Sequence, residues 1–203
     1  MKVALIGATG NQGSRTVAEL LRRSHEVTGI ARHPEKLKPQ PGLTMKKGDL
    51  SNESELVPLL AGHDAVIHSV RFQDTDVRKI ISALKQAGVK RLLVVGGAGS
   101  LEIAPGVALI DTPNFPAAYK PEAGAGRDFL NALREERELN WTFLSPSARL
   151  MPGERTGKFR LGKDELLTGA DGQSRISMED FAIALVDELE KPQHLRARFT
   201  VGY

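Results

Sequence analysis

The stretch Lys2-Val-Ala-Leu-Ile-Gly-Ala-Thr-Gly-Asn-Gln-Gly13 decides the fold, because a short apolar run passes directly into a glycine-rich loop. Residues 2–7 predict a buried strand, and the amphipathic residues from about 12 to 23 predict a helix. Glycines spaced G-x-x-G-x-x-G between a strand and a helix allow a tight turn, a close backbone approach to a ligand, and close helix–strand packing. Since helix N-termini favour anions, this loop predicts a pyrophosphate site. The alternative is a glycine cluster that binds no ligand.

Beyond this loop, short apolar runs continue to alternate with amphipathic runs. Strands are expected at 26–30, 43–47, 64–70, 91–95 and 141–144, and helices at 53–60, 76–87 and 127–139. Strands alternating with helices of this length indicate βαβ units, which join parallel strands by right-handed crossovers. Residues 1–203 are therefore predicted to form one α/β domain, a Rossmann-type doubly wound parallel sheet.

Two segments, at about 97–121 and 149–176, lack this periodicity and are rich in proline or glycine. Loops longer than about 12–15 residues are uncommon in compact domains unless they are lids, binding loops or disordered segments. Each segment follows a predicted parallel strand, so both should emerge at the carboxyl edge, where such sheets bind ligands. They are predicted to form the substrate side with a small C-terminal extension, a helix opened by a capping box at Ser177 and Asp180 and a strand at 198–203.

The composition excludes several classes of protein. The 203 residues include 28 Lys and Arg against 25 Asp and Glu, a balance of +3 that is weak support for nucleic-acid binding. The absence of cysteine excludes disulfide scaffolds, thiolate metal sites and cysteine nucleophiles. No apolar stretch approaches the roughly 18 residues that cross a bilayer. We expect a cytoplasmic protein without nucleic-acid or membrane partners; a homo-oligomer is compatible with the sequence but unsupported by it.

The end of the second predicted strand indicates which dinucleotide is preferred. Sites for NAD usually carry an acidic residue there, which accepts a hydrogen bond from the ribose 2′-hydroxyl. This chain has Arg32 instead, and a guanidinium can bind a 2′-phosphate through two parallel hydrogen bonds. The sequence therefore favours NADP(H) over NAD(H). The alternative is that Arg32 is an ordinary solvated side chain of a loop.

The fourth predicted strand ends at the sequence His-Ser-Val-Arg, residues 68–71. At this point the chain should pass the ribose and nicotinamide side of a bound dinucleotide, so contacts are expected from the backbone of Ser69, Val70 and Arg71. His68 is interpreted as a core imidazole. The five histidines are scattered and no i, i+4 helical pair stands out, so no metal site is predicted.

The proton donor of ordinary short-chain dehydrogenases, a tyrosine with a lysine four residues on, is absent. Ala123 stands four residues after Tyr119, and Tyr203 is the last residue. Hydride transfer to a flavin or quinone needs no such acid, because solvent can protonate a conjugated acceptor; proximity and a dry slot suffice. Ser147, after the predicted strand at 141–144, is a candidate donor to a substrate carbonyl or, equally, a cap for the turn.

The glycine loop, the Gly-Asp step at 48–49 and the missing Tyr/Lys pair resemble atypical short-chain dehydrogenases, the group of biliverdin reductase B and NmrA-like proteins. Segments 96–101, 141–146, 152–157 and 174–181 resemble the bacterial NADH-flavin-reductase-like NAD(P)-binding oxidoreductases, and the resemblance spans nearly the whole chain. It implies that Asp49 accepts from the adenine amino group, with a helix N-cap as the alternative, and that Leu50 packs on the adenine ring. The resemblance also implies that Ser100 lies near the position where the Ser or Thr of the family contacts substrate.

The predicted cofactor-binding residues are Gly7, Thr9, Gly10, Asn11, Gln12, Gly13, Arg32, Asp49, Leu50, Ser69, Val70 and Arg71, and the catalytic candidates are Ser100 and Ser147. The leading hypothesis is an NADPH-dependent oxidoreductase that transfers hydride to a flavin, quinone or similar conjugated acceptor without a Tyr-x-x-x-Lys acid. The alternative is an NmrA-like NADP(H)-sensing protein without turnover. A sugar-nucleotide epimerase or dehydratase is disfavoured by the missing Tyr/Lys pair.

The segment 149–163 has a local charge of +4, which exceeds the net charge of +3 of the whole chain. It contains five basic residues, Arg149, Arg155, Lys158, Arg160 and Lys163, against one acidic residue, Glu154. Such a field can draw a small anionic acceptor or hold the phosphates of a cofactor. A solvated surface run is the alternative. The predicted partner is a small anionic or aromatic molecule.

Overall fold

The computed structural model describes residues 1–50 and 52–203. The strands of its main sheet are β1 (Lys2–Ile6), β2 (Glu26–Ala31), β3 (Leu43–Lys47), β4 (Ala65–His68), β5 (Arg91–Val95), β8 (Asn140–Pro146), β10 (Arg160–Gly162) and β12 (Ala197–Gly202). The helices are α1 (Asn11–Arg22), α2 (Glu53–Leu60), α3 (Val77–Gln86), α4 (Lys120–Glu135) and α5 (Met178–Glu190). Four single 3₁₀ turns are η1 (Pro34–Lys36), η2 (Phe72–Asp74), η3 (Leu109–Asp111) and η4 (Ala117–Tyr119).

The main sheet has eight strands in the order β10-β12-β8-β5-β4-β1-β2-β3. Strand β10 runs antiparallel to β12, while the neighbouring pairs from β12 to β3 are parallel. The chain winds outward from β1 to β2 and β3, and then from β4 on the other side of β1 to β12. The predicted doubly wound, Rossmann-type sheet is therefore confirmed. Its switch point lies between β1 and β4, where open α/β sheets bind ligands.

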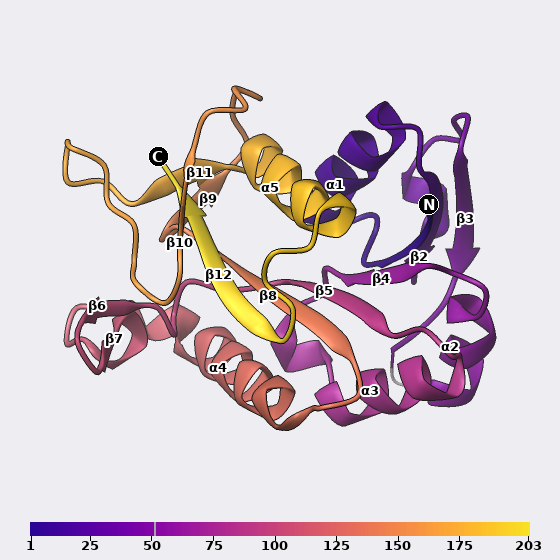
Figure 1. Ribbon diagram of the computed structural model, residues 1–203, viewed down its shortest axis with the longest axis horizontal. Coiled ribbons are helices and arrows are strands. Elements are labelled where there is room, and N and C mark those ends of the chain that lie inside the picture. Colours follow the sequence, from indigo (N-terminus) through magenta and orange to yellow (C-terminus); the bar gives the residue numbers. More distant parts are fainter. Residues whose placement is uncertain (51) are drawn as a thin grey trace.

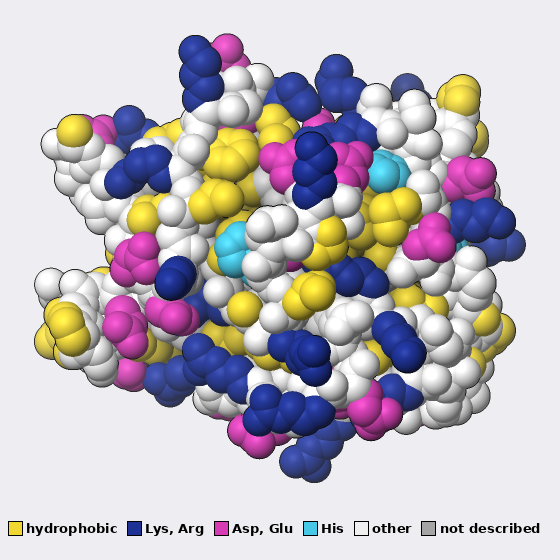
Figure 2. All heavy atoms as spheres, viewed as in Figure 1, with side chains coloured by type: hydrophobic (Ala, Val, Ile, Leu, Met, Phe, Trp, Pro, Cys, Tyr) yellow, Lys and Arg dark blue, Asp and Glu magenta, His cyan; other side chains and the backbone are white. Residues whose placement is uncertain are grey.

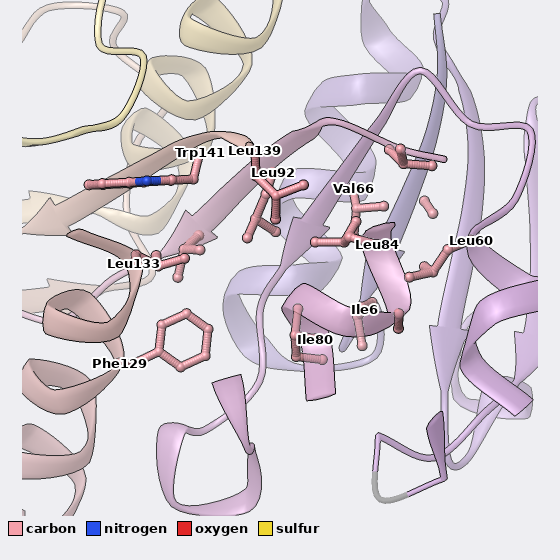
Figure 3. Close-up of a cluster of buried hydrophobic side chains, with 14 of the residues drawn as sticks. Ile6, Leu60, Val66, Ile80, Leu84, Leu92, Phe129, Leu133, Leu139 and Trp141 are labelled. Atoms are coloured by element: carbon pink, nitrogen blue, oxygen red, sulfur yellow. The ribbon is translucent and has the colours of Figure 1, made fainter. Parts of the chain in front are cut away.

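Helices cover both faces of the sheet, α1 and α5 on one and α2, α3 and α4 on the other (Figure 1). The second layer is apolar at its contact with the sheet, as Figure 3 shows for Ile80 and Leu84 of α3 beside Val66 and Leu92 of the strands. Helix α3 begins at a cap, because the Asp76 side chain accepts a hydrogen bond from the Arg78 amide at 2.9 Å. Burial of each of these apolar side chains of α3 and the strands contributes about 1.5–3 kcal/mol to the free energy of folding.

One predicted helix starts at the wrong place. The helix expected at 127–139 spans Lys120–Glu135 and so begins inside the segment interpreted as a loop. Pro121 lies in its first turn, where a missing N–H costs nothing. Gly126 weakens the local helix signal, but it makes room for an aromatic ring, since a Cβ there would lie 2.9 Å from Cδ2 of Phe72. Tertiary packing therefore overrides the loop-like composition.

The two irregular segments contain short strands. In the first, β6 (Glu102–Ala104) pairs with β7 (Val107–Ala108); in the second, β9 (Arg149–Met151) pairs with β11 (Arg175–Ser177). Strand β10 also arises from the second segment and joins the edge of the main sheet. These segments are therefore ordered additions at one end of the sheet, seen beside β12 in Figure 1.

The C-terminal extension follows the prediction closely. The Ser177 hydroxyl accepts a hydrogen bond from the Asp180 amide at 3.0 Å and caps α5. The following strand, β12, pairs with β8 in parallel. The Tyr203 hydroxyl donates to the Asp180 carboxylate at 2.8 Å, so the last residue is docked on the helix. None of the described helices combines the length and the apolar character that crossing a bilayer requires.

Candidate functional site

The glycine loop between β1 and α1 has a geometry that only glycine accommodates. Gly7 has φ +85°, and a Cβ there would lie 2.2 Å from the Ser69 carbonyl oxygen. A Cβ on Gly13 would lie 2.1 Å from the Gly7 carbonyl oxygen. The absence of side chains at Gly7 and Gly13 therefore lets α1 pack directly against the end of β1. As a result, the backbone of the loop faces the carboxyl edge of the sheet at a helix N-terminus, which favours an anion.

A cleft with a volume of about 270 Å³ lies at this edge, over the ends of β1, β2, β3 and β4. We call it the nucleotide cleft. Nine of the twelve residues predicted to bind a cofactor line it, namely Gly7, Thr9, Gly10, Arg32, Asp49, Leu50, Ser69, Val70 and Arg71. The structure therefore brings together residues from four separate strand ends. The N-cap position of α2 is occupied by Asn52, whose side chain makes no capping hydrogen bond, so the alternative role of Asp49 as the N-cap is wrong.

The other three predicted residues, Asn11, Gln12 and Gly13, lie in the first turn of α1 and do not line the cleft. The Gln12 side chain is buried and donates to the Met178 carbonyl oxygen at 3.0 Å, which ties α1 to α5. The Asn11 carbonyl oxygen accepts a hydrogen bond from Arg15 at 2.8 Å. The geometry gives these residues a part in positioning the loop. The contact of Gln12 and Gly13 was expected from the family resemblance, which does not reveal which way the Gln12 side chain turns.

The end of β2 carries two further polar residues that sequence reasoning missed. His33 and Lys36 line the nucleotide cleft together with Arg32. The His33 ring lies 3.3 Å from the carboxylate of Glu35. The signal that would have revealed Lys36 is its place one 3₁₀ turn after Arg32, because η1 folds the chain back toward the strand end. Two cationic side chains, Arg32 and Lys36, therefore line the part of the cleft where a 2′-phosphate is expected.

His68, at the end of β4, belongs to the core, as predicted. Its side chain is fully buried, and its ring contacts the rings of Phe72 and Phe129, at centroid distances of 6.1 and 5.2 Å, in a three-ring cluster. Its Nε2 is 3.2 Å from the Thr75 hydroxyl. Burial lowers the pKa of His68 to about 4, because the apolar surroundings disfavour the charged imidazolium. The imidazole is therefore neutral near pH 7.

A second cavity, with a volume of about 810 Å³, lies where β5 ends. Its wall comes from residues 96–100 after β5, from η4 and the first turns of α4, and from residues 148–151 around β9. Large apolar and aromatic side chains dominate the lining, including Phe72, Phe115, Tyr119 and Met151. Tyr119 is 66% exposed and Met151 is 58% exposed. The two segments predicted to form the substrate side therefore meet around one cavity.

The two catalytic candidates have different positions. Ser100 lines the second cavity, and its hydroxyl oxygen accepts a hydrogen bond from Arg198 at 3.2 Å. Ser147 is buried, does not line the cavity, and donates to the Val201 carbonyl oxygen at 3.0 Å. The expectation that Ser147 contacts a substrate is therefore corrected. Its hydroxyl is committed to the backbone of the neighbouring strand, the capping role that sequence reasoning weighed equally.

The two cavities meet at residues 71 and 72. Arg71 lines the nucleotide cleft, and its Nε lies 3.7 Å from the carboxylate of Glu122, which lines the second cavity. The same carboxylate accepts from the amides of Phe72 at 2.7 Å and Gln73 at 3.2 Å. Glu122 therefore fixes the turn that separates the cavities. A molecule in one cavity lies beside a molecule in the other.

Two of the five basic residues in the segment 149–163 are bound within the fold. Arg155 binds both carboxylate oxygens of Glu19 at 2.8 Å, and Arg160 donates to the carbonyl oxygens of Thr168 and Tyr203 at 2.6 Å. Burial favours the protonated carboxyl of Glu19, but the hydrogen bonds from Arg155 and Arg23 hold its pKa below the ordinary value. Of the five basic residues in the segment, Arg149 lines the second cavity.

The basic field over the whole segment stays a prediction; within it, Arg149 is the cation placed in the lining of the second cavity. On the face drawn in Figure 2, Lys and Arg side chains are spread among acidic ones rather than gathered in one patch. Among the described residues, no three His, Asp or Glu side chains are grouped so that they could hold a metal ion.

Comparisons with known proteins agree with this geometry. A protein-family model described as NAD(P)H-binding matches residues 7–192. The uncharacterised protein YwnB of Bacillus subtilis is 40% identical over 211 residues, which cover 99% of this chain and 98% of that protein. A Bacteroides thetaiotaomicron structure, provisionally named an epimerase, is 46% identical with a TM-score of 0.95, covering 100% of this chain and 96% of its own. A Streptococcus pneumoniae structure, provisionally named an NADH-flavin reductase, is 38% identical with a TM-score of 0.87, covering 100% and 99%.

Proposed function

The chain belongs to the NAD(P)H-binding family, and from this premise we propose that it is an NADPH-dependent oxidoreductase that transfers hydride to a flavin, a quinone or a similar conjugated acceptor. The observation that carries the proposal is the juxtaposition of two cavities, a glycine-cradled cleft and an apolar cavity that meet at Arg71 and Phe72. Hydride transfer needs two ring systems held in contact, and this arrangement offers a place for each.

The residues of the nucleotide cleft fit a dinucleotide. A Cβ at Gly7 or Gly13 would strike backbone atoms of the protein itself, so these glycines let the loop pack closely on the end of β4 and on α1. Gly10 lines the cleft, where a residue without a side chain lets the backbone approach a pyrophosphate. When bound, the dinucleotide would supply hydride from its reduced nicotinamide ring. The backbone from Ser69 to Arg71 would then hold the nicotinamide end at the boundary with the second cavity.

The preference for NADPH rests on the cations at the end of β2. Arg32 and Lys36 line the cleft, and two positive charges favour a 2′-phosphate over a hydroxyl. His33, next to Arg32, offers a ring nitrogen as a further hydrogen-bonding group.

The second cavity suits a flat, conjugated acceptor. Tyr119 and Met151 leave large apolar surfaces uncovered beside it, and a bound aromatic ring would cover them. Arg149 adds a positive charge to the lining, which favours an anionic substituent. Four residues after Tyr119 the chain has Ala123, which also lines the cavity, so no Tyr/Lys acid is assembled. The name of the Streptococcus pneumoniae relative supports a flavin as one acceptor.

The experiment measures two quantities on the same purified protein. NADPH binding is followed by the fluorescence of the reduced nicotinamide, and turnover by the loss of its absorbance with FMN, FAD or menadione. We expect binding and a rate well above that of heat-denatured protein. A variant that fills the cavity, Gly97→Leu, should keep NADPH binding and lose turnover, because its Cβ has room, 3.9 Å from Cε2 of Phe72, and the longer side chain would occupy the cavity that Gly97 lines.

NADP(H) sensing without turnover is the second candidate. It is favoured by one observation, the absence of a Tyr/Lys acid from a cavity lined by both Tyr119 and Ala123. It predicts NADPH binding with no oxidation by any of the three acceptors. That result would contradict the proposed reductase and support the sensor.

A further inference from the structure

We propose that Arg198 is a positioning residue that polarises the Ser100 hydroxyl, which in turn donates a hydrogen bond to the acceptor as negative charge develops on its oxygen. This inference rests on the proposed function. Ser100 lines the second cavity, whereas Arg198 and Asp164 do not. Arg198 therefore acts on the cavity only through Ser100.

The guanidinium of Arg198 is fixed on two sides. Its Nε donates to Oδ1 of Asp164 at 2.7 Å, and Nη2 donates to the same oxygen. Its Nη1 donates to the Ser100 hydroxyl oxygen at 3.2 Å. The side chain of Arg198 is 4% exposed. Since a planar guanidinium presents its donors in a rigid fork, the bond to Asp164 also aims Nη1 at Ser100.

The position of Arg198 follows from the alternation of β12. Phe199 and Val201 lie in the core under α1 and α5, so Arg198 and Thr200 point to the opposite face of the sheet. A buried arginine is costly unless it is paired. Asp164 supplies the opposite charge, and an apolar residue would fill the same space without that cost. The same cation donates a hydrogen bond to its second partner, Ser100, and so acts electrostatically on that hydroxyl.

The Ser100 hydroxyl has its proton available for the cavity. Its oxygen accepts from a charged donor, and within residues 1–50 and 52–203 no acceptor takes its proton. A hydroxyl that accepts from a cation is a stronger donor, because the two hydrogen bonds polarise in the same direction. Because Ser100 lines the second cavity, its hydroxyl can donate this proton to a molecule bound there.

The chemistry balances with a quinone as the acceptor. Hydride addition forms one bond to the quinone and breaks the donor C–H bond, so NADPH is oxidised to NADP⁺ and the quinone is reduced by two electrons to the hydroquinone monoanion. The negative charge resides on oxygen, where the Ser100 hydroxyl would stabilise it. A proton from water then completes the hydroquinone. A cationic dye such as methylene blue takes hydride at a ring nitrogen and becomes neutral, so it needs no such donor.

The first test compares these two acceptors in the same protein. Ser100→Ala should lower the kcat for menadione by about 10-fold to 100-fold and leave that for methylene blue nearly unchanged. Ser100→Thr, which keeps the hydroxyl, should restore menadione turnover. Ser82→Ala is the matched control, because the Ser82 hydroxyl lies on α3 and only accepts from Gln86. An equal effect of Ser100→Ala on both acceptors, or no effect, would overturn the inference.

The second test needs no turnover and addresses Arg198 itself. 4-Nitrophenol, whose phenolate mimics the hydroquinone anion, is bound in the second cavity and titrated by its colour, with displacement by menadione marking the site. The pKa of the bound dye should be about one unit lower in the wild type than in Ser100→Ala. Arg198→Lys keeps the charge but not the fork, so its value should fall between. Identical dye pKa values in the wild type, Ser100→Ala and Arg198→Lys would refute the proposal.

The two proposals fail in different ways. If the wild-type protein binds NADPH but fails to oxidise it whichever acceptor is supplied, the proposed function is contradicted. A wild-type protein that reduces both menadione and methylene blue, with Ser100→Ala slowing the two alike, keeps that function and removes the role of Arg198 and Ser100.

Discussion

Arg71 and Glu122 lie 3.7 Å apart, Nε to Oε2, at the boundary between the nucleotide cleft and the second cavity. Glu122 comes from the first turn of α4, and Arg71 follows β4. The carboxylate also accepts from two successive amides of η2. One side chain of α4 therefore fixes both the turn between the cavities and the arginine beside the expected nicotinamide.

This relationship predicts a stability effect of Glu122. Phe72 is buried, so removing the carboxylate leaves its amide without a partner, which costs about 1–3 kcal/mol. Glu122→Ala should lower the free energy of unfolding by that amount, and Glu122→Gln by less, because an amide oxygen still accepts. Urea denaturation measures both. Glu138→Gln is the control, since Glu138 is exposed and pairs with Lys85 at the surface. Equal effects of the Glu122 and Glu138 variants would contradict this account.

The cations at the end of β2 predict cofactor discrimination. Arg32→Ala should raise the Kd for NADPH by about 10-fold or more and change the Kd for NADH little, because NADH has no 2′-phosphate. Lys36→Ala should act in the same direction. Lys38→Ala is a matched control two residues away, outside the cleft lining. Fluorescence titration with both dinucleotides decides the point, and a parallel loss of NADH and NADPH affinity would show that Arg32 has no part in the preference.

Much of this cleft was predictable, because its residues occur at strand ends that the local pattern marks. The end of each strand in the first half of the chain is signalled by the residues that follow it, as at Gly7 and Gly48. Parallel strands bring these ends to one edge whatever lies between them. Lys36 was missed because a 3₁₀ turn, rather than a strand end, brings it back to the cleft; His33 precedes that turn and directly follows Arg32.

The second cavity was less predictable, because its contacts join residues far apart in the sequence. Arg198 and Ser100 are separated by 98 positions, and Arg155 and Glu19 by 136. No local pattern distinguishes a serine that faces a cavity, Ser100, from one committed to a carbonyl oxygen, Ser147. The start of α4 was misplaced for the same reason, since the packing of Phe72 explains Gly126 and local propensity does not.

The buried imidazole predicts how stability depends on pH. Because the pKa of His68 is lowered to about 4 from its ordinary value near 6.5, the unfolded chain binds more protons than the folded one between these values. The contribution is fully present above pH 6.5 and is lost as the pH falls toward 4, by about 3 kcal/mol at the lower end.

His68→Phe removes this titration while keeping a ring among Phe72 and Phe129. Between pH 7.5 and pH 4.5 the wild type should lose more unfolding free energy than this variant, because only the wild type has the imidazole that takes up a proton on unfolding. Urea denaturation at several pH values measures it. A difference between the two proteins that stays constant over this range would show that His68 does not take up a proton on unfolding.

Two arginines of one segment, Arg149 and Arg155, should differ in their effects on the acceptor. Arg149 is exposed in the lining of the second cavity, whereas Arg155 is bound at both ends of the Glu19 carboxylate. Arg149→Gln should therefore raise KM for an anionic acceptor such as FMN by several-fold and change KM for menadione little, since only FMN is attracted by the charge.

Arg155→Gln should change the ratio of the two KM values little and lower stability instead, because it leaves the buried Glu19 with fewer partners. Steady-state kinetics at two salt concentrations provide a further check, because the effect of Arg149→Gln should fade as salt screens the field. If Arg155→Gln changes the KM ratio as much as Arg149→Gln does, the whole segment acts as a field and the local account is wrong.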